Sequence, residues 1–353
     1  MSGWSVVSAL GMGAAAFTAG VRAGRRAVSR VEADHGPLPV PAVGLVPQFS
    51  PSAVLGKKGT RSMDRATGLA VTAVRLLLEH EPGLVAAADG EVGLVLGTTM
   101  GSVESTMAFT CDSLTQEKPY HVDPARFPNT VMNCAAGQCA IWHRLRGPNA
   151  TIAGGHVSTL LALNYAVRLQ RCGHVETVLC GAVEEFSAQR SWLEWHSQGP
   201  GWAPGEACGV FLLEPSPVAV ARGREPLAEV LALEFGVHGE DVSPREALAA
   251  CVRKALDGAG LSTQDVWAVS PSGGEGPDGV EEEAALTDVF DGCSPRRAPS
   301  VELVGDTGAA SGAVQLAAVL ALAGGDARAH RQAALVTSID LDGLLGCALV
   351  RMA

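Results

Sequence analysis

Short apolar segments, each followed by glycine or serine and then by a helical pattern, recur along the whole chain. Runs of this kind are typical of buried strands in a parallel sheet, where a crossover helix joins one strand to the next. The pattern therefore predicts an α/β protein. In the first part of the chain the predicted strands are Val92–Gly97, Ala150–Ala153, Thr177–Ala182 and Cys208–Leu213.

The same design begins again after Pro215. We therefore divide the chain into two halves, residues 1–217 and 218–353, and the element order alone suggests that one is a structural duplicate of the other. No literal sequence repeat accompanies this order. The strands predicted in the second half are Val266–Ser270, Ala334–Ile339 and Cys347–Arg351.

Three helices of the second half have distinct sequence signals. The segment Ser243–Glu246 combines an N-cap, a first-turn proline and a capping-box glutamate, and the helix that it begins should end near Gly258 and Gly260. The acidic run Glu281–Glu283 suits the start of a second helix, because negative charge at a helix N-terminus is favourable. The small residues of Gly308–Ala323 predict a third helix that is deeply buried and closely packed.

Charge and cysteine usage exclude several classes of function. The chain has 37 acidic and 26 basic residues, a net charge of −11, and no concentrated basic face for nucleic acid or an anionic membrane. Its nine cysteines form no Cys-x-x-Cys pair, which favours a reducing, cytoplasmic location without disulfides or a structural metal, and we expect no cofactor. No apolar run reaches the roughly 18 residues of a membrane span, and no signal peptide is recognisable.

His156 has the most distinctive position in the sequence. It follows the predicted strand Ala150–Ala153 and a Gly154–Gly155 turn, and it begins a predicted helix over Val157–Arg171 that is apolar nearly all round. A residue at such a helix start is held rigidly beside backbone N–H groups that have no partner within the helix. The sequence therefore predicts a nucleophile or an anion site at this position.

A series of short motifs along nearly the whole chain resembles the β-ketoacyl synthases, the condensing enzymes of fatty-acid and polyketide assembly. Their number, order and spacing carry the resemblance, which implies the five-layer αβαβα thiolase-like fold with two pseudo-repeated halves. The motifs are Met63–Arg65, Val95–Thr98, Phe127–Val131 with Ala136–Gln138, Leu145–Asn149, Pro204–Val210, Leu261–Val266 and Gly305–Ala313.

The resemblance also places this chain's counterparts of the family's Cys-His-His site. The acyl-accepting cysteine is replaced by His156, and the two histidines by Ser272 and Asp306, while Val301 stands where a lysine is usual. The family's Gly-Phe-Gly-Gly loop is replaced by Asp340–Gly343. Because imidazole does not hold a stable thioester, these substitutions exclude condensation of the usual kind.

The function that this resemblance implies is that of a condensation-incompetent subunit similar to a chain-length factor. Such a subunit pairs with an active ketosynthase in type II polyketide or fatty-acid-like biosynthesis and shapes its acyl pocket. We expect a heterodimer with a ketosynthase, or a homodimer, through the region Asn133–Trp142, and an acyl carrier protein as a further partner. The chain is shorter than family members between Glu185 and Pro204 and before Leu261, where substrate-facing loops normally lie.

Other hypotheses for the site remain open at this point. His156 is expected to be a space-filling plug that donates to a backbone carbonyl, but Ser272, His156 and Asp306 are also the residue types of a Ser-His-Asp triad. That triad would make the chain a stand-alone hydrolase, acyltransferase or cyclase on thioester-linked substrates. Decarboxylation alone, or an anion site at the helix start, is a further possibility.

Two residue groups outside this site have alternative interpretations. Cys134 and Cys139 are expected to be small core residues rather than nucleophiles. Trp192, Trp195 and Trp202 crowd a short segment, where they either form an exposed surface for a partner or ligand or cover the shortened loop.

Overall fold

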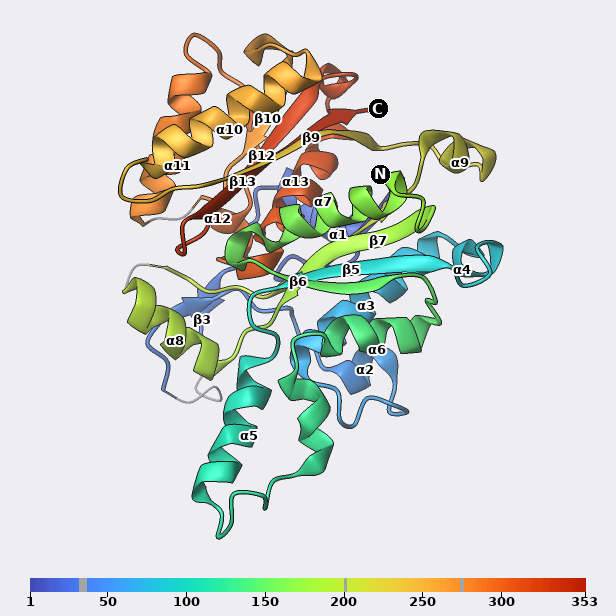
Figure 1. Ribbon diagram of the computed structural model, residues 1–353, viewed down its shortest axis with the longest axis vertical. Coiled ribbons are helices and arrows are strands. Elements are labelled where there is room, and N and C mark those ends of the chain that lie inside the picture. Colours follow the sequence, from blue (N-terminus) through green and yellow to red (C-terminus); the bar gives the residue numbers. More distant parts are fainter. Residues whose placement is uncertain (32–36, 200–201, 274–275) are drawn as a thin grey trace.

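The computed structural model describes residues 1–31, 37–199, 202–273 and 276–353, and its strands form two main sheets (Figure 1). The six-stranded sheet has the order β2-β1-β8-β7-β5-β6, and the five-stranded sheet has the order β11-β10-β12-β13-β9. The strands of the first sheet are β1 (Gly3–Ser8), β2 (Gly11–Met12), β5 (Val92–Thr98), β6 (Asn149–Ala153), β7 (Thr177–Glu184) and β8 (Ala207–Leu213). Those of the second are β9 (Ala228–Val237), β10 (Val266–Ser270), β11 (Arg296–Arg297), β12 (Ala333–Ile339) and β13 (Leu344–Met352), and a separate ribbon pairs β3 (Ser29–Arg30) with β4 (Ala42–Val43).

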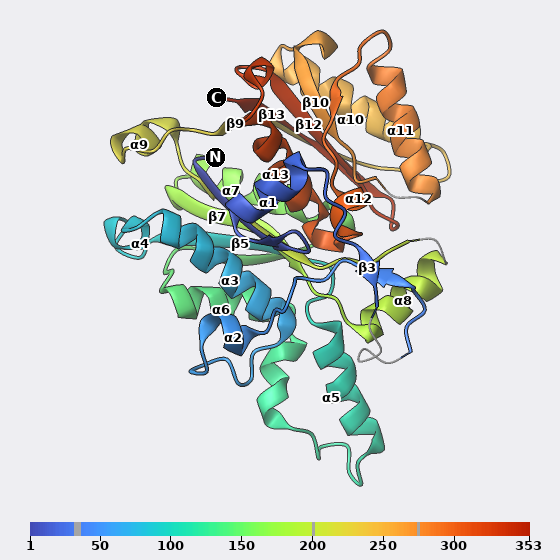
Figure 2. The same cartoon turned by 180° about the vertical axis from the view of Figure 1, so that it is seen from behind.

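Helices cover both faces of both sheets (Figures 1 and 2). Between the sheets lie α1 (Ala14–Arg22), α7 (Ser158–Arg171) and α13 (Ser311–Ala323), and α13 contacts strands of both. The outer face of the first sheet packs against α3 (Arg65–His80) and α6 (Cys134–His143), and that of the second against α10 (Pro244–Ala259) and α11 (Pro277–Val289). This is the five-layer αβαβα arrangement that the resemblance implied, and the prediction of fold class is confirmed.

Shorter or peripheral helices complete the molecule. One pair, α5 (Val103–Thr115) and the 3₁₀ helix η2 (Pro124–Thr130), projects away from the body as an arm (Figures 1 and 2). The others are α2 (Pro51–Leu55), α4 (Leu84–Ala87), α8 (Ala188–Gln198), α9 (Ser216–Ala221), α12 (Val301–Val304), η3 (Gly155–Val157), η4 (Thr263–Asp265), η5 (Gly308–Ala310) and η6 (Ala327–Ala329). None of the helices in the described part of the chain is long and apolar enough to cross a bilayer.

The main core lies between the sheets and explains the small residues of α13. Eleven of its thirteen residues are buried, and a Cβ added at Gly312 would lie 2.9 Å from Cβ of Thr159 on α7. Glycine therefore permits the close approach of these two helices, as the sequence predicted. Separate apolar clusters fill the layers between each sheet and its outer helices.

Three predictions, one about the sheets and two about helices, need correction. Both sheets are mixed rather than parallel, because four pairings are antiparallel: β1–β8, β7–β8, β12–β13 and β13–β9. In the case of β12 and β13, a tight turn joins the two strands without a crossover helix. Helix α11 begins at Pro277 rather than at Glu281, with Asp278 as the acid of its first turn. Helix α7 is not apolar all round, because Asn164, Tyr165 and Arg168 form an exposed stripe.

Every strand of the first main sheet comes from residues 3–213, and every strand of the second from residues 228–352. Helix α9 spans the predicted division between residues 217 and 218. That division into two domains stays a prediction.

Candidate functional site

The start of α7 lies between the two sheets, where β6 ends at Ala153 and η3 turns the chain into the helix. Gly155 has a φ of +53°, and a Cβ at this position would lie 1.8 Å from Oδ1 of Asp340. Any side chain at residue 155 would therefore be strained and would collide with that carboxylate. The glycine permits Asp340, from the end of the second sheet, to approach the backbone at the start of α7.

His156 is held between two carboxylates. Its Nε2 lies 3.0 and 3.1 Å from the two carboxylate oxygens of Asp306, and its Nδ1 lies 3.2 Å from Oδ1 of Asp340. Burial would by itself lower the pKa of His156, but the charge of Asp306, with hydrogen bonds to both carboxylates, raises that pKa well above its ordinary value. His156 is therefore an imidazolium that donates from both ring nitrogens. The expected hydrogen bond from its ring to a backbone carbonyl is wrong, because two acidic side chains converge on the ring.

Asp306 is fixed by hydrogen bonds to the backbone of Gly308 and of Ala203. Its carboxylate accepts the Gly308 N–H at 2.8 Å, and its own N–H donates to the Ala203 carbonyl at 2.8 Å. Burial would raise the pKa of Asp306, but the charge and hydrogen bond of His156, together with the charge of Arg190, hold it well below its usual range. The structure thus brings His156 and Asp306 together, as a close ion pair.

Ser272 is engaged elsewhere. Its Oγ donates to Oε2 of Glu282 at 2.7 Å, and its backbone N–H donates to Oε1 at 3.0 Å. Glu282 is fully buried and also accepts from Gly273 N–H and from the Thr337 hydroxyl. Among the described residues no hydrogen bond joins Ser272 to His156, and both ring nitrogens of His156 already have carboxylate partners. The catalytic roles assigned to Ser272, His156 and Asp306 stay predictions.

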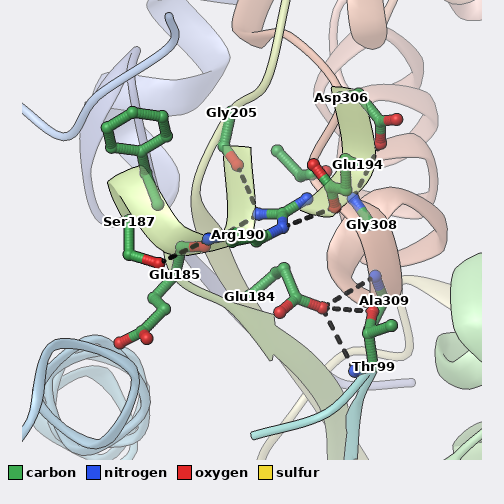
Figure 3. A network of polar contacts seen from close by, with 12 residues as sticks. Thr99, Glu184, Glu185, Ser187, Arg190, Glu194, Gly205, Asp306, Gly308 and Ala309 are labelled. Atoms are coloured by element: carbon green, nitrogen blue, oxygen red, sulfur yellow. Dashed lines mark hydrogen bonds and ion pairs between the residues drawn. The ribbon is translucent and has the colours of Figure 1, made fainter. Parts of the chain in front are cut away.

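A buried arginine adjoins this site and was not found by sequence reasoning (Figure 3). Arg190 of α8 donates from Nε to Glu194 at 2.7 Å and from Nη1 to the carbonyls of Glu185 and Gly205 at 2.8 and 3.1 Å. Burial raises the pKa of Glu194 to about 7, although the charge of Arg190 acts to lower it. The i, i+4 spacing of Arg190 and Glu194 on α8 was the only available signal.

Arg190 and the His156 pair belong to one buried set of charges. Arg190 is 2% exposed, and its charge acts on both Asp306 and Glu184. Glu184, at the end of β7, accepts the N–H groups of Thr99 and Ala309 and a hydroxyl hydrogen bond from Thr99 (Figure 3). Two cations, Arg190 and His156, are thus enclosed among several carboxylates, which is a pattern of charge neutralisation rather than of a reactive nucleophile.

The other residues singled out in the sequence lie in varied surroundings. Cys139 is fully buried in the core beneath the first sheet, and burial raises its pKa far above that of a reactive thiol. Cys134 is half-buried, and burial raises its pKa as well. Trp192 and Trp195 pack edge to face on α8, where Trp192 lines an open apolar hollow, while Trp202 packs against a small cluster that contains Phe186.

The described residues contain no group of three or more His, Cys, Asp or Glu side chains arranged to hold a metal ion. The carboxylates around His156 are each occupied by hydrogen-bond donors of the chain itself.

Comparisons with known proteins find a matching family model and several similar proteins. Residues 1–219 match the family model described as "Beta-ketoacyl synthase, N-terminal domain". The chain is 26% identical over 264 residues to 3-oxoacyl-[acyl-carrier-protein] synthase 2 of Vibrio cholerae, which covers 67% of this chain and 63% of that protein. It is 30% identical over 300 residues to a putative polyketide beta-ketoacyl synthase 2 of Streptomyces virginiae, over 78% of this chain and 73% of that one.

A solved structure is more similar still. The structure described as "The ishigamide ketosynthase/chain length factor" matches with a TM-score of 0.94 and 44% sequence identity, over 100% of this chain and 98% of that chain. By contrast, the matches to the first three curated 3-oxoacyl synthase relatives span 63%, 52% and 49% of their lengths.

Proposed function

The chain belongs to the β-ketoacyl synthase family, and on that premise we propose that it is a condensation-incompetent subunit, similar to a chain-length factor, that pairs with an active ketosynthase and shapes its acyl pocket. The pair would act in type II polyketide or fatty-acid-like biosynthesis. The similarity to a structure described as a ketosynthase/chain length factor supports this assignment.

The observation that carries the proposal is that a carboxylate lies against each ring nitrogen of His156. The resemblance puts the family's acyl-accepting cysteine at this position, at the start of α7. An imidazolium that donates from Nδ1 to Asp340 and from Nε2 to Asp306 has no free lone pair with which to attack a thioester. Supplying such a lone pair would require loss of a proton, which the two adjacent carboxylates oppose.

The two positions that correspond to the family's histidines also oppose the reaction. In the family these histidines promote decarboxylation and stabilise a developing negative charge. Here one position presents the carboxylate of Asp306, and the other presents Ser272, whose hydroxyl is bound to Glu282. A carboxylate beside a developing enolate would raise its energy, because like charges repel strongly where water is excluded.

A partner is suggested by what this chain leaves uncovered. Strand β6 is an edge of the first sheet, pairs only with β5 among the residues that the structure describes, and is only half-buried. The projecting arm, made of α5, η2 and the segment 116–123 that joins them, exposes large apolar side chains, with exposed fractions of 80% for Leu114, 70% for Tyr120 and 59% for Phe127. Unpaired edges and contiguous exposed apolar residues are typical of interaction surfaces. We assign this edge and arm to the ketosynthase partner, whose acyl pocket the arm would line.

The decisive experiment is co-expression with the ketosynthase of the same pathway. We expect a 1:1 heterodimer by size-exclusion chromatography with light scattering, and product formation from malonyl and acyl carrier proteins only by the pair. The His156→Ala variant should retain at least about half of the pair's rate. A condensing activity of the isolated chain that disappears in His156→Ala would refute the proposal.

The arm has a matched control. Phe127→Glu should weaken the heterodimer by at least about tenfold, because an interfacial aromatic is replaced by a charge. Val280→Glu on α11 changes a comparably exposed apolar residue, at 65%, in the outer layer beyond the second sheet and should have no effect. Equal effects of the two variants would show that the arm is not part of the interface. A stable complex of two copies of this chain alone would show that its partner is a second copy rather than a ketosynthase.

A simple assay tests the alternative that the chain is a stand-alone hydrolase. A triad requires Ser272 to donate to His156, and the hydrogen bond from Ser272 to Glu282 does not favour it. Turnover of an acyl thioester by the isolated chain, abolished by Ser272→Ala, would establish the hydrolase in place of the subunit.

A further inference from the structure

Asp340 makes an unusual contact with the backbone at the start of α7. Its Oδ1 accepts the backbone N–H of His156 at 2.8 Å, and its Oδ2 accepts the N–H of Asp342 at 3.2 Å. Backbone donors from two distant segments thus converge on one carboxylate, since Asp340 is 184 residues from His156 in the chain. The imidazolium of His156 adds a third contact, with Nδ1 at 3.2 Å from Oδ1.

This arrangement has the features of an anion hole that is already filled. Backbone N–H groups that converge beside a helix start stabilise negative charge, and in acyl transfer they stabilise the oxyanion that forms when a thioester carbonyl is attacked. The carboxylate of Asp340 is negatively charged in the folded protein: burial would raise its pKa, but hydrogen bonds from His156 lower it overall. A second anion would compete with the Asp340 carboxylate for these two N–H groups and would be repelled by its charge.

The local geometry shows that the contact is built into the chain. Gly155 leaves room for the carboxylate, since a Cβ there would lie 1.8 Å from Oδ1 of Asp340. The turn that follows β12 is closed by the hydrogen bonds from Asp340 N–H to the Leu344 carbonyl and from Gly343 N–H to the Asp340 carbonyl. Asp340 is therefore held at its position by its own turn.

We propose that Asp340 is the chain's own occupant of an anion hole formed by the backbone N–H groups of His156 and Asp342, and that it closes the site to acyl thioesters whatever residue stands at position 156. This inference deepens the proposed function, on which it rests, because it gives a second and separable reason for the absence of condensation. It predicts that supplying a nucleophile alone does not restore acyl transfer.

The test uses a cysteine at position 156 with and without the carboxylate. In His156→Cys, the thiolate would attack the carbonyl carbon of butyryl-coenzyme A, forming the C–S bond while the carbonyl π electrons move to oxygen. Collapse of that oxyanion breaks the bond to the coenzyme A sulfur, and the released thiolate takes up the proton that the cysteine gave up. Only the intermediate oxyanion needs the hole.

Butyrylation is followed by intact mass spectrometry, and alkylation by iodoacetamide is measured in parallel. Alkylation forms no oxyanion and reports only the reactivity and accessibility of the thiol. We expect His156→Cys to be alkylated but hardly butyrylated. In His156→Cys/Asp340→Ala, butyrylation should accelerate by at least about 100-fold, which is the usual effect of one oxyanion donor, while alkylation changes by less than about tenfold. The control variant His156→Cys/Asp241→Ala loses an exposed aspartate in place of Asp340, and its butyrylation and alkylation rates should equal those of His156→Cys.

Two results would overturn the inference. Equal acceleration of butyrylation and alkylation would mean that Asp340 acts only through charge or access, and rapid butyrylation of His156→Cys would mean that the hole is open. Neither result bears on partner-dependent synthesis by the unmodified chain, so failure of this inference is distinguishable from failure of the proposed function.

A second measurement avoids the cysteine variants altogether. In Asp340→Ala, the vacated donors and His156 should bind acetate, so that sodium acetate raises the melting temperature by several degrees relative to sodium chloride at equal concentration. The unmodified chain and Asp241→Ala should show no such rise. If acetate does not raise the melting temperature of Asp340→Ala either, the proposed anion hole is refuted.

Discussion

The strongest quantitative prediction concerns the ion pair between His156 and Asp306. At 3.0 Å and an effective dielectric constant of about 20, the attraction of two unit charges amounts to roughly 5 kcal/mol before desolvation is subtracted. Both side chains are less than one-fifth exposed, so removal of either partner leaves a largely buried charge. We expect Asp306→Asn and His156→Gln each to lower the free energy of unfolding by about 3 kcal/mol. The double variant should cost at least about 1 kcal/mol less than the sum.

Urea denaturation followed by tryptophan fluorescence at pH 6 measures this coupling. The pKa of Asp306 is lowered, so its contribution is present above its ordinary pKa of 3.8 and is lost only in stronger acid. The pKa of His156 is raised, so its contribution is complete below 6.5 and is lost as the pH rises through the folded-state pKa. The coupling should therefore be constant between about pH 5 and 6.5 and decline in alkali.

The chain contains a matched surface pair for comparison. Arg245 and Asp288 approach to 2.6 Å but are largely exposed, so Asp288→Asn should have little measurable effect on unfolding. A coupling between His156 and Asp306 below about 0.5 kcal/mol, or one that does not change up to pH 10, would refute the assignment of a buried imidazolium–carboxylate pair.

Three further predictions follow from individual residues. Gly155→Ala should destabilise the chain by about 2 kcal/mol or more in thermal or urea unfolding, because residue 155 has a positive φ and a Cβ there would clash with Asp340. The control Gly137→Ala, on the open face of α6, should be neutral or should stabilise the chain by about 0.5–1 kcal/mol. Burial raises the pKa of Glu185 from 4.5 to about 8, so stability should fall by as much as roughly 5 kcal/mol between about pH 4.5 and 8, and Glu185→Gln should flatten that slope in urea titrations at several pH values. Fluorophosphonate should not label Ser272, and Ser272→Ala should leave product formation by the heterodimer within about twofold; a labelled Ser272 detected by peptide mass spectrometry would contradict this.

The order of the secondary-structure elements is largely a property of the sequence. Strand β10 coincides with the predicted Val266–Ser270, and α10 has the capping box that Ser243 and Glu246 predict. The position of His156 at the start of α7 was also predictable, because apolar periodicity and a Gly-Gly turn are local signals. Such features depend on residues a few positions apart, and they are encoded wherever the pattern is regular.

The pairing of the site residues was decided only by the tertiary structure. Asp306 and Asp340 are 150 and 184 residues from His156, and they reach it because α7 lies between two sheets whose ends converge on its first turn. The alternative hypothesis of a triad would join Ser272 to His156, but the Ser272 hydroxyl donates to Glu282 on α11, ten residues further along the chain. A sequence lists the charged groups, but it does not state which of them are desolvated together. Burial and distance set the partner and the protonation state of each group, and both arise only when the layers pack.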